Sequence, residues 1–156
     1  MNQEKRKILT LCIIHEHPRV LLGMKKKGFG EGKWNGFGGK LEKGESIEEA
    51  CLRELHEEAG IAPKTLIKLG VLDFRFQKNP HEVLEVHIFK GHGIEGEPRE
   101  SDEMHPAWFH VDDVPFQKMW PDDIHWFPLF LADKRFNGTF LFGDGDAIIE
   151  KELTEI

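Results

Sequence analysis

Two glutamates, Glu54 and Glu58, fall inside the apolar face of a predicted helix. At about 100° per residue they lie near −20° and +20° on the helical wheel. The apolar arc around them consists of Ile47, Ala50, Cys51, Leu55 and Ala59, with Glu57 at its edge. Because the two carboxylates repel each other across one turn, burying them is costly unless a cation is present. A hard divalent ion held by oxygen atoms would remove that cost, whereas the alternative is a charged helix face in solvent.

The ends of this helix can be read from the residues that flank it. Ser46 is a good N-cap, and Glu49 three residues later completes a capping box. Gly60 suits a left-handed C-cap. We therefore expect a helix from about residue 47 to 59 that presents its carboxylates on one side.

The stretch 39–61 as a whole, GKLEKGESIEEACLRELHEEAGI, resembles the Nudix box at every fixed position. Those positions are Gly39, Glu45, Arg53, Glu54, Leu55, Glu57, Glu58, Gly60 and Ile61. The resemblance to Nudix hydrolases implies an α/β fold, an α/β/α sandwich with a mixed β-sheet between helices. It also implies cleavage of a nucleoside diphosphate linked to another group, with Mg²⁺, or possibly Mn²⁺, as cofactor.

Further segments resemble the branch of this family that hydrolyses oxidised purine nucleoside triphosphates, such as 8-oxo-dGTP and 2-hydroxy-dATP, to the monophosphate and pyrophosphate. They are GMKKKGFGEGKWNGFGGK, SDEM, PFQKMWPDD and WFPL. The resemblance implies nucleotide contacts by Thr10, Lys25, Asn35, Phe37, Gly38, Gly39, Lys40, Trp120, Pro121, Asp122 and Asp123. It implies metal ligands at the Gly38 carbonyl, Glu54, Glu57, Glu58 and Glu103. Leu84 departs from the methionine usual in this branch, so base affinity is expected to differ.

The residue types alone also favour a purine pocket. Asn35 and the pair Asp122 and Asp123 offer donors and acceptors to a base edge, although a helix N-cap is the simpler role for the aspartates. Three aromatic residues can stack on a flat ring, or can belong to the core instead: Phe29, Phe74 and Trp120. The glycine-rich stretch 25–40 is not a P-loop, and its lysines, Lys25, Lys33 and Lys40, can meet phosphates as point charges.

The expected mechanism uses a metal-activated water and a carboxylate base. Glu57, Glu58 or a base outside the box can take the proton, and the sequence leaves these alternatives open. Arg53 lies four residues before Glu57, so we expect it to orient that carboxylate by an ion pair. Two other functions stay open: a Nudix hydrolase of other modified nucleotides, such as methylated purine triphosphates, and an inactive nucleotide-binding module. The intact glutamates weigh against the inactive module.

The composition of the chain limits the classes of molecule that the protein is expected to bind. The 156 residues suggest one domain spanning 1–156, and the net charge of −7 argues against binding a polynucleotide backbone. Cys12 and Cys51 stand in apolar patterns typical of buried thiols in a reducing compartment. We expect a cytoplasmic monomer, with nuclear or mitochondrial nucleotide pools possible, that acts on a small nucleotide and binds no membrane. Nine histidines include the close pairs His15/His17 and His105/His110, whose spacing indicates no structural zinc site.

Hydrophobic patterning places the elements that carry these residues. Strands are predicted at 8–14, 19–24, 66–76, 83–89 and 106–111, with a closing hairpin of 139–142 and 147–153. The first of these is expected to be central and to form a hairpin with the second. Residues 90–105 are predicted to be a polar loop. The aromatic-rich segment 116–128 is predicted to open a second helix, with Asp122 or Asp123 as its N-cap.

Overall fold

A computed structural model describes residues 4–156, so the first three residues of the expected domain lie outside the described part. One eight-stranded mixed sheet runs through the molecule in the order β3-β2-β1-β5-β4-β7-β8, and β6 pairs with β2. The strands are β1 (Lys5–Glu16), β2 (Arg19–Lys25), β3 (Trp34–Asn35), β4 (Ala62–Phe76), β5 (Asn79–Glu95), β6 (Met104–His110), β7 (Phe136–Phe142) and β8 (Ile148–Glu155). The helices are α1 (Ile47–Ala59) and α2 (Asp123–Leu131).

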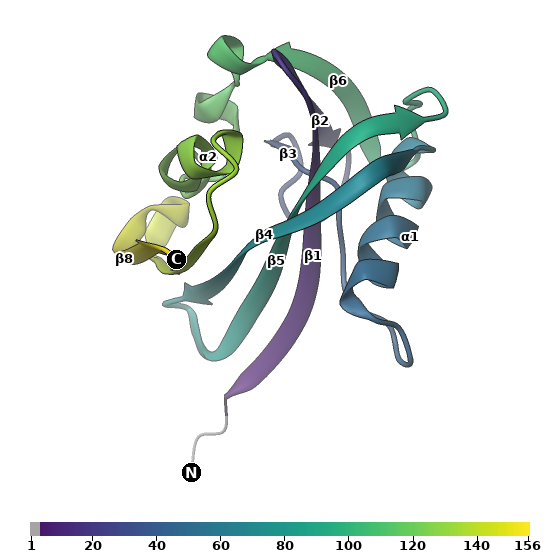
Figure 1. The fold of residues 1–156 in the computed structure, drawn as a ribbon. Coiled ribbons are helices and arrows are strands. Elements are labelled where there is room, and N and C mark those ends of the chain that lie inside the picture. The colour runs from purple at the N-terminus through teal and green to yellow at the C-terminus, as the bar shows by residue number, and fades with distance from the viewer. Residues whose placement is uncertain (1–3) are drawn as a thin grey trace.

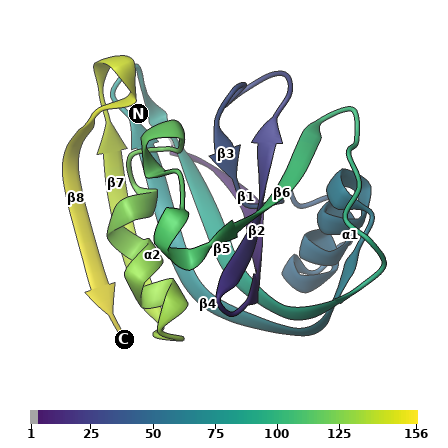
Figure 2. The same ribbon diagram turned by 90° about the horizontal axis from the view of Figure 1, so that it is seen from above.

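The two helices lie on opposite sides of the sheet, which confirms the predicted sandwich (Figures 1 and 2). Alternation along the central strand β1 divides the core. Ile13 joins a cluster that contains the buried aromatic residues of α2, whereas Cys12 and Ile14 join the cluster under α1. Cys12 and Cys51 are both buried free thiols, as expected. Within residues 4–156, neither helix is long and apolar enough to cross a bilayer.

Strands β1 and β2 form the predicted hairpin, but they pair only from Ile14 to Glu16 and then diverge. The segment 34–40 fills the fork between them. Asn35 pairs with Gly23 of β2, while the amide of Cys12 donates to the carbonyl of Phe37 (2.6 Å) and the amide of Thr10 donates to the carbonyl of Gly39 (2.9 Å). This insertion carries the glycine-rich stretch into the middle of the sheet.

Most strands extend beyond their predicted ends, and the largest difference is at the end of β5. The expected loop 90–105 starts only after Glu95, because β5 continues alongside β4 as far as Ala62. The polar residues Lys90 and His92 made this part of the strand look like a loop in the sequence. The second helix begins at Asp123 with Asp122 at the N-cap position, as expected, and 116–118 before it forms only a 3₁₀ turn.

Candidate active site

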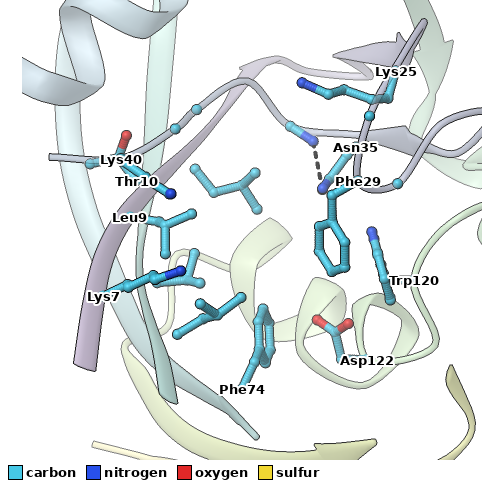
Figure 3. A pocket seen from close by; sticks show the side chains of 18 of the residues that line it. Lys7, Leu9, Thr10, Lys25, Phe29, Asn35, Lys40, Phe74, Trp120 and Asp122 are labelled. Carbon is cyan, nitrogen blue, oxygen red and sulfur yellow. Dashed lines mark hydrogen bonds between the residues drawn. The ribbon is translucent and has the colours of Figure 1, made fainter. Parts of the chain in front are cut away.

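A cleft of about 1030 Å³ opens between the fork segment and α2, and it contains most of the predicted site residues. It is lined by residues of β1, the loop 25–30, the segment 35–40, β4, β5 and the start of α2. The predicted residues on its wall are Thr10, Lys25, Phe29, Asn35, Gly38, Gly39, Lys40, Glu58, Phe74, Leu84, Glu103, Trp120, Asp122 and Asp123. Residues separated by more than a hundred positions thus share one cavity (Figure 3).

One end of the cleft is acidic and is held by α1. The helix has the predicted capping box between Ser46 and Glu49 and the predicted left-handed cap at Gly60 (φ 72°). Glu58 is only 3% exposed, and its Oε1 accepts a hydrogen bond from the amide of Gly38 at 2.8 Å. Burial raises the pKa of Glu58 to about 8, although the Gly38 amide opposes that rise.

Positions 38 and 39 require glycine, because the backbone passes very close to its neighbours here. A Cβ atom on Gly38 would lie 1.7 Å from the carbonyl oxygen of Thr10. A Cβ atom on Gly39 would lie 2.5 Å from Oε1 of Glu54. Any larger residue would therefore push the segment away from both β1 and the carboxylates.

Arg53 lies beside the cleft and organises the acidic residues around it. Its guanidinium donates to Glu45 at 2.7 and 3.0 Å, to Glu54 at 2.9 Å and to the carbonyl of Lys40 at 3.1 Å. The predicted ion pair with Glu57 is present at 3.3 Å but is longer than the contact with Glu45. Glu45 is the partner that our sequence reasoning missed, although it is a fixed position of the box.

The acidic end offers an all-oxygen donor set that fits a hard divalent cation. Glu58 and Glu103 line the cleft with carboxylates, and Gly38 lines it with its backbone. The predicted ligands Glu54 and Glu57 do not line the cleft but lie next to it on α1, beside Arg53. The cation would also compensate the energetic cost of burying the charged carboxylate of Glu58. Among residues 4–156, no three such side chains already surround a single point, so an ion would have to draw its ligands together. Lys25 pairs with Glu103 at 3.5 Å and would have to release it.

The other end of the cleft holds two buried aspartates. Asp122 is 1% exposed and Asp123 is 3% exposed. The indole Nε1 of Trp126 donates to Oδ2 of Asp122 at 2.8 Å, whereas Oδ1 of Asp122 and Oδ2 of Asp123 have no hydrogen-bond partner within residues 4–156. Burial raises the pKa of both carboxyls, and the neighbouring charge of Asp122 raises that of Asp123 further. Asp122 occupies the N-cap position of α2, as the simpler alternative predicted, but its side chain makes no cap hydrogen bond.

Aromatic rings form the walls next to the aspartates. Figure 3 shows Phe29 lying beside Trp120. Phe29 is 68% exposed, and the two ring centroids are 5.0 Å apart with planes 30° apart. Lys33 lies over the same indole at 5.2 Å. Phe74 lines the cleft and also packs edge-on against Phe142 at 5.6 Å, so it serves both pocket and core.

Two predicted contacts differ from what the structure shows. Phe37 is fully buried under α1, and its amide and carbonyl both bond to Cys12, so it anchors the fork segment and does not face the cleft. Pro121 does not line the cleft either, although its neighbours Trp120 and Asp122 do. The sequence reasoning missed Leu9 and Phe142, which line the cleft and follow the strand alternation that could have revealed them.

The fold and this acidic cleft define a metal-assisted hydrolase of phosphate compounds, and comparison with known proteins agrees. Residues 5–130 match the NUDIX domain. The chain therefore belongs to the Nudix family, and it is a Nudix hydrolase. Members of this family use divalent metal ions.

Individual relatives are similar over nearly the full length. The chain is 55% identical over 150 residues to the oxidized purine nucleoside triphosphate hydrolase of Danio rerio, with 96% of each chain covered. It is 49% identical to the protein of the same name from Mus musculus, again with 96% of each covered. A crystal structure of a MutT protein from Bacillus halodurans superposes with a TM-score of 0.83 at 30% identity, covering 94% of this chain and 97% of that one.

Proposed function

We propose that the chain hydrolyses oxidised purine nucleoside triphosphates, such as 8-oxo-dGTP and 2-hydroxy-dATP, to the monophosphate and pyrophosphate, with Mg²⁺ as cofactor and Mn²⁺ as a substitute. The names of the fish and mouse relatives support this substrate class. The observation that carries the proposal is that one cleft joins the buried pair Asp122 and Asp123 to the buried Glu58. A purine and its phosphates would occupy those two ends.

The aspartate pair is suited to reading a purine edge. Two adjacent buried carboxyls cannot both stay ionised at low cost, so they share one proton. Trp126 stabilises the charge on Asp122, so the proton resides on Asp123, whose pKa is raised more. The two free oxygens then present one donor and one acceptor. If the proton moves to Asp122, the positions of donor and acceptor reverse. One arrangement suits a 6-carbonyl purine and the other a 6-amino purine, so the same pocket can accept both.

At the acidic end, Glu54, Glu57, Glu58, Glu103 and the Gly38 carbonyl would hold the divalent ion. When bound, that ion neutralises phosphate charge and lowers the pKa of a bound water. Arg53 fixes Glu54 and Glu57 for this task. Lys25 and Lys40 line the cleft and can bind phosphate oxygens. Glu57, Glu58 or a base outside the box takes the proton.

A turnover panel tests the proposal. The protein is assayed with Mg²⁺ on 8-oxo-dGTP, 2-hydroxy-dATP, a methylated purine triphosphate, dGTP and dATP, with monophosphate and pyrophosphate separated by chromatography. We expect the highest kcat/KM on the oxidised pair and a kcat at least about 10²-fold lower for Glu58→Gln. A preference for the methylated nucleotide would replace the substrate assignment. No turnover of any nucleotide, despite tight binding, would leave only the binding-module alternative.

The proposal extends to a monomer that acts on the small-nucleotide pool of the cytoplasm, or of the nucleus or mitochondria. One chain supplies every wall of the cleft, and the charge of −7 disfavours polynucleotides. Light scattering of the eluted protein and imaging of the tagged chain in cells test these two points. A dimer mass, or exclusion from all three compartments, would contradict them.

A further inference from the structure

A group of histidines lies at the end of β1 that points away from the cleft. His15 is four residues beyond Leu11, the last cleft residue of β1, which is about 13 Å along a strand. His17 follows in the turn after β1, and His92 projects from β5 onto the same region. Beside them are Lys90 of β5 and Asp133, which comes just after α2. We call His15, His17 and His92 the distal histidine cluster.

Two nitrogens of this cluster already face each other. Nε2 of His15 lies 3.1 Å from Nδ1 of His17, and the two ring centroids are 5.3 Å apart. Two imidazoles that bind one metal at about 2.05 Å place their nitrogens 3.1 Å apart when the angle at the metal is about 100°. That angle lies between the octahedral and tetrahedral values. The separation therefore suits a shared metal as well as a shared proton.

His92 can supply a third nitrogen. Its ring centroid is 6.2 Å from that of His15, at an angle of 33° between planes. Three imidazoles around one ion have centroids about 4.5–5.3 Å apart when the nitrogens are about 2.05 Å from it and the angles at the metal are tetrahedral or octahedral. The half-buried His92 would therefore have to move about 1 Å closer to His15 to complete the site. His17 is exposed, so an ion can reach the pair from solvent.

The surroundings of His15 leave its Nε2 facing His17. His15 is 7% exposed, and Nε2 is the nitrogen that would bind the ion. Its other ring nitrogen, Nδ1, has no hydrogen-bond partner within residues 4–156. The ammonium of the neighbouring Lys90 is neutralised by Asp133 at 2.7 Å.

Although the sequence spacing of His15 and His17 indicates no structural zinc site, their geometry leads us to propose that the two chelate a divalent transition-metal ion such as Zn²⁺ or Ni²⁺, with His92 as third ligand and solvent completing the shell. Imidazole nitrogens select these ions over Mg²⁺, which prefers oxygen, so this site and the acidic end of the cleft take different metals. Within residues 4–156, neither place has three ligands gathered before the ion arrives. The bound ion would tie the end of β1 to β5. The inference does not depend on the proposed substrate.

Calorimetry on the full-length untagged protein tests the site, with Zn²⁺ or Ni²⁺ as titrant at pH 7.5 and excess Mg²⁺ present to occupy the cleft. We expect one site of micromolar affinity, weakened by at least about 10-fold in His17→Ala and by less in His92→Ala. His81→Ala is the matched control, because His81 is an exposed histidine outside the cluster. This variant should bind the titrated metal ion with the same affinity as the parent.

Each other outcome overturns the proposal. Equal affinity in His17→Ala and the parent would place the ion elsewhere, and its loss in Glu58→Gln would place it in the cleft. Failure of the parent to bind would remove the site. Mg²⁺-dependent hydrolysis by His17→Ala should stay at the parental rate, which also shows that this variant is folded.

Discussion

Replacing Glu58 by glutamine should raise the stability of the metal-free protein. The folded-state pKa is about 8, against an ordinary value of 4.5, so between these values the folded state holds a proton that the unfolded state has released. An acid with a raised pKa contributes stability below pH 4.5 and loses it as pH rises towards 8. At about 1.36 kcal/mol per pH unit, the penalty at pH 7 is about 3 kcal/mol. Glutamine carries no charge and still offers an oxygen to the amide of Gly38.

Urea denaturation in EDTA at pH 5, 7 and 8.5 measures this effect. The Glu58→Gln variant should gain less than about 1 kcal/mol at pH 5, about 3 kcal/mol at pH 7 and about 4–5 kcal/mol at pH 8.5. Glu57→Gln is the matched control, since the Glu57 side chain is 57% exposed and its removal should change stability little. With Mg²⁺ present the order reverses, because the parent gains binding energy that the variant lacks. The variant should also lose at least about 10²-fold in kcat.

Two results would refute this reasoning. If Glu58→Gln is no more stable than the parent at pH 7 in EDTA, then burial does not hold the carboxyl in its protonated form. If the gain is the same at pH 5 and pH 8.5, it comes from packing and not from the titration of Glu58. Near-parental turnover by both Glu58→Gln and Glu54→Gln would show that these carboxylates bind no catalytic metal.

Three further predictions concern the base pocket and the distal end. Trp120→Ala should lower kcat/KM for all purine triphosphates alike, by about 10- to 100-fold, through lost stacking. Asp122→Asn should lower kcat/KM unequally for 8-oxo-dGTP and 2-hydroxy-dATP, because an amide cannot exchange its donor and acceptor roles by protonation. Equal losses of kcat/KM for the two substrates would contradict the proposed proton exchange. For His15, the pKa of about 4 lies below the ordinary 6.5, so the unfolded state takes up the proton first and stability falls as pH drops from 6.5 to 4. Across that pH range the free energy of unfolding should fall by up to about 3 kcal/mol in the parent and not in His15→Phe. An equal fall in the variant would show that groups other than His15 cause it.

Local signals in the sequence were enough to place α1. Ser46, Glu49 and Gly60 fix its ends through backbone hydrogen bonds that depend only on near neighbours, and the structure shows these bonds. The hairpin of β7 and β8 was predictable for the same reason. The mixed sheet between two helices followed from the family resemblance and not from periodicity.

Features that depend on distant partners were not predictable. Glu45 precedes Arg53 by eight residues across a turn, so no helical spacing points to the contact that holds the guanidinium most closely. Phe37 looks like a pocket residue in a glycine-rich loop, but its burial is decided by Cys12 and α1. The extension of β5 depends on pairing with β4, which the polar residues Lys90 and His92 conceal.

The fork segment 34–40 explains why one cleft has both an acidic and a base-reading end. Asn35 is tied to β2, whereas the backbone at Gly38 and Gly39 lies against Thr10 of β1 and the carboxylates of α1. A segment of seven residues thus spans the distance between the two ends, and its position is fixed at both. Any change that moves it, such as a side chain at Gly39, would shift Glu54 and Asn35 together. The proposed metal binding and base selection would therefore be joined through the backbone of this segment.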